Sequence, residues 1–492
     1  MPADDRQACY DALLARDPRF DGRIYVAVRT TGIYCRPICR VRAPLLANCT
    51  FHGSAASAER AGYRPCLRCR PELAPGCSPA DAVPRLAALA ARRIEDGALS
   101  TMSVDALAAE FGVGGRHLRR SLKAELGTTP VALAQTQRLL LAKRLLAETA
   151  MGMTQVAHAS GFSSLRRFNA LFQGRYRLKP SSLRRLKSID EDVYTFSIAY
   201  RPPLAWGDLL RFLDGRALPG VERVVGGVYR RTARVGAHVG WISLRPGPQP
   251  NTLAATLSAS LGPAASAVIA RLKALVDARA EPRRIADHLA SDPLMAPLVA
   301  ARPGLRVPGA FDGFEATTRA ILGQQVSVAG ARTLAGRFVA RFGDPVGTPA
   351  EGLTHHAPSA DRLASATLDE VAAVGIPGRR AGTIIAVARA VAEGRLALEA
   401  GSDPSRAYDT LVAIDGIGPW TAEYVAMRAL AWPDAFPAGD LGIAKALGVA
   451  KPAQSRIRAE GWRPWRSYAV MHLWHANVPV IETREDADAT AR

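Results

Sequence analysis

The segment Leu411-Val-Ala-Ile-Asp-Gly-Ile-Gly-Pro-Trp-Thr-Ala422 decides how the rest of the chain is interpreted. An apolar helical run over residues 407–414 meets a tight turn that contains Gly416 and Gly418, and a second helix is predicted over residues 420–429. Glycines this close together let the backbone bend sharply and bring bare N–H groups, at a helix N-terminus, onto an anion. The segment therefore predicts two helices joined by an anion-binding turn.

A single acid follows at Asp440, after the turn Phe436-Pro-Ala-Gly and before a helix predicted over residues 441–447. On its own, Gly-x-Gly is a common turn, and an Asp in this place is more often a helix N-cap than a catalyst. The turn and the acid together resemble the helix-hairpin-helix family of DNA glycosylases. This resemblance implies that Gly416 and Gly418 grip one DNA phosphate and that Asp440 is catalytic.

The composition is that of a large, basic, globular protein. Its 492 residues are enough for two to four domains, and 48% of them are hydrophobic. The net charge of +20 favours a polyanionic partner, above all nucleic acid, although an arginine-rich host proteome is the alternative source of this charge. No apolar run approaches the ~18 residues of a membrane span, and the N-terminus lacks the features of a signal peptide. We therefore expect a cytoplasmic protein with no membrane partner.

All seven cysteines lie within the first 77 residues. Two short pairs, Cys35 with Cys39 and Cys66 with Cys69, supply four soft ligands, which suit tetrahedral zinc. Spacing alone favours a purely structural zinc knuckle. Because no cysteine follows Cys77, we expect no iron–sulfur cluster of the kind that some hairpin-containing relatives carry.

The residues around these pairs narrow the interpretation. The segments Thr30-Thr-Gly-Ile-Tyr-Cys35-Arg-Pro-Ile-Cys39 and Ala61-Gly-Tyr-Arg-Pro-Cys66-Leu-Arg-Cys69 closely resemble the N-terminal domain of the Ada adaptive-response proteins. The resemblance implies that Cys35, Cys39, Cys66 and Cys69 bind zinc. It also implies that Cys35 accepts a methyl group from a DNA methylphosphotriester.

The chemistry expected at Cys35 is a stoichiometric transfer. A zinc-bound cysteine is a thiolate at neutral pH, and a thiolate is a nucleophile. In-line attack would restore the charge of the DNA backbone and leave S-methylcysteine on the protein. The loss of one negative charge would weaken repulsion from DNA and so act as a switch. Five arginines are expected to surround the site and clamp the strand: Arg36, Arg40, Arg64, Arg68 and Arg70.

A helical, Ala/Leu/Arg-rich region is predicted after a short linker at residues 78–81. Helix, glycine-containing turn and helix follow one another at residues 104–122, and a weaker echo at residues 153–172 is followed by Lys179-Pro-Ser-Ser-Leu-Arg. This tandem is similar to the AraC-type DNA-binding domain, with a bundle carrying solvated arginines as the alternative. The recognition helices, about residues 115–125 and 163–173, would place in major grooves Arg116, Arg119, Arg120, Arg166, Arg167 and Asn169.

The third region begins with predicted strands and carries no chemistry of its own. The strands are expected at residues 194–200, 224–232, 237–245 and 252–257, with a helix over residues 206–215. This α+β segment resembles the N-terminal subdomain of the AlkA-type alkylbase glycosylases.

The segment Phe311-Asp-Gly-Phe-Glu-Ala-Thr-Thr-Arg-Ala-Ile-Leu-Gly-Gln-Gln325-Val-Ser-Val matches another part of that family. There the loop wedges a side chain into the gap left by an everted base. Some members are apolar where this chain has Gln325. Gln324 and Gln325 therefore either fill the gap or cap a helix and touch the minor groove.

The family resemblance places Trp420, Tyr424 and Trp474 around the everted base. A methylated purine is electron-poor, often cationic, and stacks well on electron-rich indole faces, although any one of these aromatics alone would be assigned to the core. Asp440 would stabilise an oxocarbenium-like sugar or orient water. Because Trp420 stands where lyase-type relatives have a Lys, we predict a monofunctional glycosylase. Trp462, Trp465 and Tyr468 are assigned to packing.

The expected fold class is multidomain and mainly α, with α+β parts. Its domains are a small zinc α+β domain (residues 1–77), a tandem helix-turn-helix domain (82–187), an AlkA-like α+β subdomain (192–304), a helix-hairpin-helix glycosylase domain (305–481) and a disordered tail (482–492).

Together the resemblances imply DNA alkylation repair coupled to an adaptive response. The expected activities are a glycosylase of the DNA-3-methyladenine glycosylase II type, a methylphosphotriester sensor and a transcriptional regulator. Expected partners are double-stranded DNA, as alkylated lesions and as promoter DNA, and RNA polymerase, with the protein itself a monomer. The alternative is a regulator whose C-terminal half binds DNA without excising bases. Repair of O-alkylguanine is excluded, because no cysteine follows Cys77.

Overall fold

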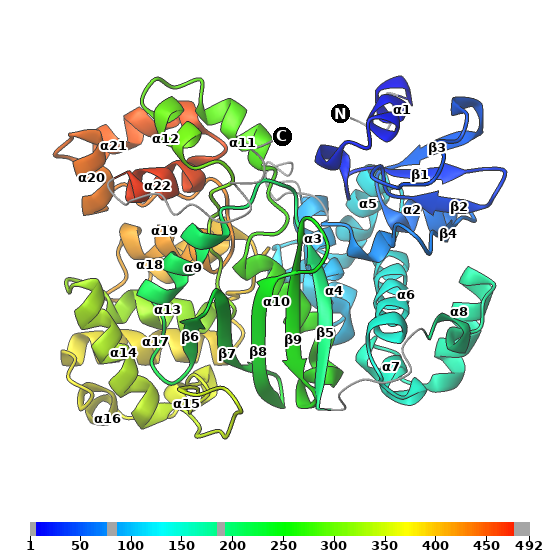
Figure 1. Ribbon diagram of the computed structural model, residues 1–492. Coiled ribbons are helices and arrows are strands. Elements are labelled where there is room, and N and C mark those ends of the chain that lie inside the picture. Colours follow the sequence, from blue (N-terminus) through cyan, green and yellow to red (C-terminus); the bar gives the residue numbers. More distant parts are fainter. Residues whose placement is uncertain (1–5, 76–85, 185–191, 477–492) are drawn as a thin grey trace. The chain divides into compact units, whose positions relative to one another are not determined.

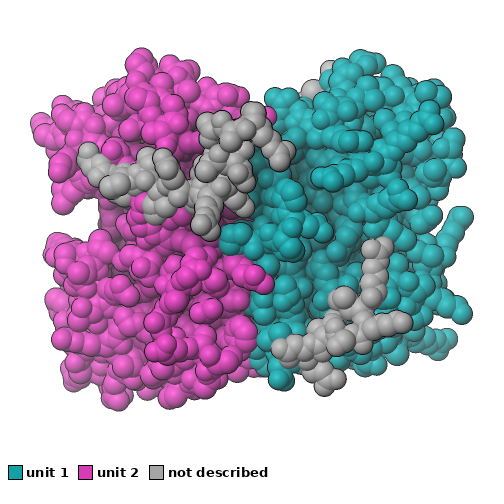
Figure 2. Space-filling model, viewed as in Figure 1, with its two compact units in different colours: residues 1–202, 246–270 teal, residues 203–245, 271–492 magenta. Residues whose placement is uncertain are grey.

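The computed structural model describes residues 6–75, 86–184 and 192–476 (Figure 1). The chain divides into two compact units, residues 1–202 with 246–270 and residues 203–245 with 271–492 (Figure 2). The predicted linker at residues 78–81 and the predicted tail at residues 482–492 lie outside the described ranges. Within those ranges, no helix is both long and apolar enough to span a membrane.

The cysteine-rich part of the first unit is a four-stranded sheet of order β3-β1-β2-β4. The central strand β1 pairs antiparallel with β2 and β3, in a register that places Val26 opposite Cys35 and Phe51, and β2 pairs in parallel with β4. Tyr25 and Tyr34 pack edge to face in the core beside this sheet. Its elements are α1 (Arg6–Leu14), β1 (Tyr25–Val28), β2 (Ile33–Cys35), β3 (Cys49–His52), α2 (Ala55–Arg60) and β4 (Arg64–Pro65).

Six helices follow in the same unit, as the tandem helix-turn-helix pattern predicts. Local signals set their limits, because the Ser103 and Ser164 side chains cap two helix N-termini and Gly127, with φ of 65°, ends a third helix. Both predicted recognition helices, α5 and α8, are helices that bury one apolar face. The six are α3 (Leu86–Glu95), α4 (Val104–Glu110), α5 (Gly115–Leu126), α6 (Pro130–Glu148), α7 (Met153–Ala159) and α8 (Leu165–Tyr176).

Buried polar contacts join the cysteine-rich part to these helices. The Lys143 ammonium on α6 donates to the carbonyl of Cys66 at 3.1 Å and pairs with Glu72 at 2.7 Å. The Glu59 carboxylate of α2, which is 1% exposed, accepts hydrogen bonds from three hydroxyls. These belong to Tyr34 (3.1 Å), Thr136 (3.0 Å) and Tyr176 (3.3 Å).

Antiparallel strands occupy the region of the predicted α+β segment. In the first unit β5 (Val193–Ala199) pairs with β9 (Thr252–Ser258), and in the second unit β6, β7 and β8 form a meander. The prediction of one strand over residues 224–232 is wrong. Gly226 and Gly227, with φ of 59° and 74°, form a two-residue turn that splits this segment into a hairpin. The meander strands are β6 (Glu222–Val225), β7 (Val228–Val235) and β8 (His238–Pro246).

The rest of the second unit is helical, and its buried Trp462, Trp465 and Tyr468 confirm their assignment to packing. Helices α18 and α19 contact each other across the predicted turn. The helices are α9 (Trp206–Gly215), α11 (Pro282–Leu289), α12 (Met295–Ala301), α13 (Gly313–Leu322), α14 (Val328–Phe342), α15 (Ala360–Ala364), α16 (Leu368–Ala372), α17 (Gly378–Ala392), α18 (Pro404–Val412), α19 (Pro419–Arg428), α20 (Leu441–Leu447), α21 (Pro452–Ala459) and α22 (Arg466–His475). Helix α10 (Ala265–Leu275) has residues in both units.

Candidate functional sites

The four predicted zinc ligands come together in the first unit. Cys35 ends β2, Cys39 lies in the loop after it, and Cys66 and Cys69 follow β4. One sulfur from each residue lies within 4.8 Å of the others, and three of the four cysteines are buried. Backbone N–H groups donate to two of the sulfurs, from Arg36 to Cys69 at 3.3 Å and from Arg68 to Cys66 at 3.4 Å. Four soft, clustered donors supported in this way fit a tetrahedral zinc ion.

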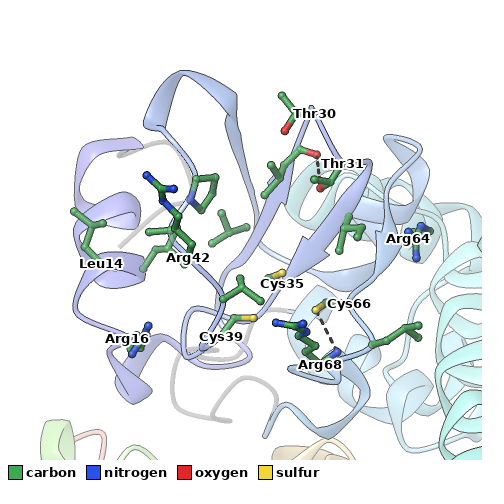
Figure 3. Close-up of a pocket in the computed structure, with 18 residues that line it drawn as sticks. Leu14, Arg16, Thr30, Thr31, Cys35, Cys39, Arg42, Arg64, Cys66 and Arg68 are labelled. Carbon is green, nitrogen blue, oxygen red and sulfur yellow. Dashed lines mark hydrogen bonds between the residues drawn. The ribbon is translucent and has the colours of Figure 1, made fainter.

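A pocket of about 540 Å³ opens beside this cluster. Figure 3 shows the sulfurs of Cys35, Cys39 and Cys66 gathered at one side of it, with Arg68 next to them. Its walls are largely apolar, and four arginines contribute to its lining: Arg16, Arg42, Arg64 and Arg68. Arg16 and Arg42 were not predicted, because neither lies next to a cysteine in the sequence.

Two of the five arginines that were expected to clamp DNA point inward instead. The Arg36 guanidinium is buried and pairs with Asp21, whose carboxylate outweighs the effect of burial and holds the pKa of Arg36 above its usual value. Arg70 pairs with Glu72 and Glu148 at 3.0 and 2.7 Å. The prediction is therefore wrong for Arg36 and Arg70, because nearby carboxylates inside the protein neutralise both.

The two predicted recognition helices present a basic surface. Arg116, Arg119 and Arg120 on α5, like Arg166 and Arg167 on α8, are exposed, whereas Asn169 is half-buried. Arg119 approaches Asp105 at 3.5 Å, but both side chains are largely solvated, so this pair is weak. These side chains remain available to DNA.

The hairpin at Gly416 has the geometry that its sequence predicts. Gly416 has φ of 88°, and a Cβ there would lie 2.1 Å from the Thr383 hydroxyl oxygen, so only glycine fits. Gly418 caps α19 without a side chain, and its N–H has no hydrogen-bond acceptor among the described residues. An exposed N–H at a helix N-terminus suits an anion.

The two glutamines of the predicted wedge loop differ in their surroundings. The Gln324 side-chain amide donates to the carbonyl of Gly416 at 3.0 Å and to the Thr421 hydroxyl at 3.1 Å. It therefore braces the hairpin, a role that the sequence did not reveal. Gln325 is exposed and has φ of 55°, in the left-handed region that residues other than glycine rarely adopt.

Asp440 brings the base-pocket candidates together. Its Oδ1 accepts from the Trp474 indole N–H at 2.9 Å, and its Oδ2 accepts from the Trp420 indole N–H at 3.1 Å. Oδ1 also accepts from the backbone N–H of Ile443 at 3.0 Å, so Asp440 is the N-cap of α20 as well. A Cβ at Gly442 would lie 3.1 Å from Asp440 and 3.3 Å from Trp474, so this glycine permits their close approach.

The aromatic rings form a continuous stack beside Asp440. Trp420 and Tyr424 are stacked with centroids 5.4 Å apart, and Tyr424 lies 6.3 Å from Trp474. Trp474 is stacked in turn on Phe212 at 6.4 Å. Phe212, on α9, was not predicted as a site residue. The half-buried Trp420, Tyr424 and Trp474 leave ring surface open to a planar ligand.

Guanidinium groups lie against this stack. Arg428 donates to the Tyr424 hydroxyl at 2.8 Å and lies 4.7 Å from the Phe212 ring. Arg216 lies 3.9 Å from the same ring. Burial alone would raise the pKa of Tyr424, but the nearby cations Arg428, Arg216 and Arg319 hold it below its usual value. Burial and the other arginines also lower the pKa of Arg428.

Four family models match successive parts of the chain. The metal binding domain of Ada matches residues 8–72, and a helix-turn-helix domain matches residues 107–186. The AlkA N-terminal domain matches residues 195–312, and the HhH-GPD superfamily base excision DNA repair protein matches residues 318–467.

A relative from Mycobacterium tuberculosis, described as a probable bifunctional transcriptional activator/DNA repair enzyme AlkA, is 41% identical over 96% of both chains. This chain belongs to that family. The DNA-3-methyladenine glycosylase 2 of Escherichia coli is 38% identical over 57% of this chain and 96% of its own length. The bifunctional transcriptional activator/DNA repair enzyme Ada of E. coli is 38% identical over 30% of this chain and 41% of its own.

Membership of this family of bifunctional activator and repair enzymes confirms the predicted fold class and the pairing of repair with regulation. The chain is an AlkA-type DNA glycosylase that also carries a helix-turn-helix domain and an Ada-type zinc-binding domain. The sequence missed Phe212, Arg216, Gly442 and the bracing role of Gln324. The contact of Arg428 with Tyr424 was also missed, although the sequence could have predicted it. Arg428 lies four residues after Tyr424 and therefore on the same face of α19.

Proposed function

We propose that the aromatic pocket of the second unit hydrolyses the N-glycosidic bond of alkylated purines of the 3-methyladenine type. The observation that carries this is the pair of indole N–H groups that fix both oxygens of Asp440 beside a stack of open aromatic rings. An electron-poor purine inserted against these rings would place its sugar next to the carboxylate. The regulator without excision, our alternative, would not require this arrangement.

In the proposed reaction the bond between C1′ and the base breaks, and its electron pair leaves with the base. The Asp440 carboxylate faces the sugar as positive charge develops there. It orients the water whose oxygen bonds to C1′, and that water releases one proton to solvent. No lysine lies at position 420 to form a Schiff base, so the product is an abasic site in an intact strand. Gly416 and Gly418 hold a phosphate of that strand, and Gln325 enters the gap left by the base.

The test is excision of 3-methyladenine from methylated duplex by Asp440→Asn. Asn keeps the oxygen that caps α20 and the size of the side chain, but it removes the charge. We expect excision to fall about 100-fold or more. Asp403→Asn, which alters the N-cap of α18 in the same way, should leave excision unchanged. Full excision by Asp440→Asn would exclude the assignment.

We further propose that Cys35 accepts a methyl group from a DNA methylphosphotriester. Cys35, Cys39, Cys66 and Cys69 would hold zinc, which supplies the charge that keeps the sulfurs as thiolates. The Cys35 sulfur forms a bond to the methyl carbon, and the ester C–O bond breaks with its electrons on the phosphate oxygen. The adjacent pocket, with its apolar walls and its arginines, suits a methyl ester within a charged backbone.

Mass spectrometry after exposure to methylphosphotriester DNA should show one added methyl group on Cys35. Cys49→Ala, which changes a buried cysteine outside the cluster, should still be methylated once. A wild-type protein with no methylated Cys35 would make the zinc site purely structural. In that case the Asp440 assignment would stand unchanged.

We propose that the helix-turn-helix pair binds promoter DNA, which the basic faces of α5 and α8 support. We also propose that RNA polymerase is a partner and that the protein is a monomer. Replacing Arg116 and Arg166 together with Gln should weaken binding to promoter fragments and reduce its salt dependence. Excision by the second unit should be retained. We assign residues 1–77, 82–187, 192–304 and 305–481 to the successive domains.

A further inference from the structure

One peptide group lies between the two helices whose indoles hold the Asp440 carboxylate. It joins Ala435 to Phe436, shortly before Asp440, and both residues are buried. Its N–H donates to the Glu423 carboxylate at 3.0 Å, and its carbonyl accepts from the Ser467 hydroxyl at 3.0 Å. Glu423 belongs to α19 and Ser467 belongs to α22. This peptide is therefore held at both of its polar atoms, once by each helix.

The same two helices hold the other end of the loop, at Asp440. On α19, Trp420 lies three residues before Glu423 and donates to Oδ2 of Asp440. On α22, Trp474 lies seven residues after Ser467 and donates to Oδ1. Residues three or seven apart lie on the same face of a helix. Each helix therefore contributes one contact to the start of the loop and one to its end.

The loop between these two ends is short and bonded within itself. The Ala438 N–H donates to the Phe436 carbonyl at 2.8 Å, and the Asp440 N–H donates to the Pro437 carbonyl at 2.9 Å. The ring of Pro437 also fixes its own φ. A displacement of the peptide between Ala435 and Phe436 would therefore be passed on to Asp440 rather than absorbed on the way.

The position of Glu423 calls for an acceptor oxygen more than for a charge. Burial, aided by Asp434, raises the pKa of its carboxyl despite the nearby Arg466 and Arg456. Arg466 already pairs with Asp434 at 2.7 Å. The Phe436 N–H needs only an oxygen to donate to, and the amide of a glutamine offers one as well.

We infer that Glu423 and Ser467 are positioning residues for base excision, and that they act through Asp440. By fixing the peptide between Ala435 and Phe436, they set the place of the carboxylate beside the aromatic rings. A displacement of about 1 Å can cost about 100-fold in rate, because the stabilisation of charge at the sugar depends on the position of the carboxylate. The inference rests on the proposed glycosylase function of this pocket.

A purely structural role would be to satisfy a buried peptide group, and this role would affect different measurements. With the full-length protein in excess over methylated duplex, the single-turnover release of 3-methyladenine gives the rate of excision. Affinity is measured separately, on a duplex that contains one tetrahydrofuran analogue of an abasic site. In Glu423→Ala we expect the rate to fall about tenfold, while Kd for this duplex changes by less than about twofold.

Two further variants sharpen this expectation. Glu423→Gln keeps the acceptor and should restore the rate to within about twofold of the wild type. Ser467→Ala should lower the rate severalfold, a smaller effect, because the Ser467 hydroxyl shares its proton between the carbonyls of Ala435 and Trp432. The matched control Glu393→Ala removes an exposed acid of the same unit and should change neither measurement.

A double variant tests whether Glu423 acts through Asp440. Glu423→Ala added to Asp440→Asn should cost no further rate, since the charge to be positioned is already gone. A full further loss in the double variant would overturn the inference. So would an equal loss of rate and affinity in Glu423→Ala, a failure of glutamine to restore the rate, or a wild-type rate in Glu423→Ala or Ser467→Ala.

Asp440→Asn by itself separates this inference from the function on which it rests. If Asp440→Asn retains full excision, the proposed function fails. If Asp440→Asn loses excision and Glu423→Ala behaves as the wild type, only the positioning role fails.

Discussion

The cysteine cluster and the base pocket are both proposed to act on methylated DNA, but they do so with different chemical groups. The cluster gathers four sulfurs from a short stretch of chain, and its proposed nucleophile, Cys35, keeps the group that it removes. The base pocket uses open aromatic faces and a single carboxylate, Asp440, that forms no lasting bond. A site that is consumed acts once and retains the methyl group, so it has no product to release. A site that turns over must release its product, and its half-buried rings allow this.

Removal of the metal should have the largest effect, because it should abolish the activity of the cysteine cluster and leave that of the base pocket. A chelator should unfold the cysteine-rich part, because the binding free energy of a structural zinc site is about 10 kcal/mol or more and much of it is folding free energy. Limited proteolysis should then cut within residues 6–75, and methyl acceptance should be lost. Excision of 3-methyladenine should continue, since no cysteine lies in the second unit. Loss of both activities together would contradict this independence.

A smaller effect is expected on the free energy of unfolding of the first unit, which should depend on pH. Burial raises the pKa of Glu59 to about 7, only partly offset by Arg175 and three hydroxyl donors. Folding therefore favours the protonated acid, so its contribution is complete below about pH 4.5 and is lost as the pH rises through about 7. The loss is about 3 kcal/mol.

In Glu59→Gln the free energy of unfolding of this unit should vary less between pH 5 and pH 8. Chemical denaturation followed at each pH measures this, with the exposed Glu125→Gln as the matched control. A slope identical to that of the wild type would show that Glu59 does not titrate on folding.

The base pocket can be tested through one hydrogen bond. Trp474→Phe keeps an aromatic ring on the stack but removes the N–H that holds Oδ1 of Asp440. We expect excision to fall about tenfold, which corresponds to about 1.4 kcal/mol of positioning. Trp420→Phe, which frees the other oxygen, should have a similar effect. If both variants retain wild-type rates, the indole contacts do not orient the carboxylate.

The smallest expected change comes from Gly442→Ala. The added Cβ would press on Asp440 and on Trp474 at 3.1 and 3.3 Å, so one of them must shift by a few tenths of an ångström. We expect a severalfold loss of excision with little change in thermal stability. Gly461→Ala, where a Cβ meets nothing within 4 Å, is the control.

The sequence was sufficient to predict those parts of the sites whose residues lie close together in the chain. The four cysteines and the hairpin glycines occupy short segments whose spacing already fixes their geometry. The pocket is different, because Phe212 and Arg216 lie about two hundred residues before Trp420. Phe212 belongs to the amphipathic helix α9, whose pattern predicts an ordinary core helix, and Arg216 directly follows that helix. The misassigned Arg36 and Arg70 fail for the same reason. Asp21 and Glu148, which pair with them, are brought near only by the fold, although Glu72, the second partner of Arg70, lies two residues away in the sequence.

The contacts of Glu59 and Glu72 with helices α6 and α8 have a consequence for how this protein was assembled from its parts. A fragment that ends at residue 77 would strip Glu59 of Thr136 and Tyr176, and Glu72 of Lys143. Glu59 would keep the Tyr34 hydroxyl and Glu72 would keep Arg70, but the lost contacts would have to be replaced by new partners or by water. A gene fusion that replaced the helix-turn-helix domain after the methyl-acceptor domain would therefore also have to replace the residues that make these contacts with Glu59 and Glu72. We therefore expect the cysteine-rich part and the helix-turn-helix domain to be inherited together rather than exchanged separately.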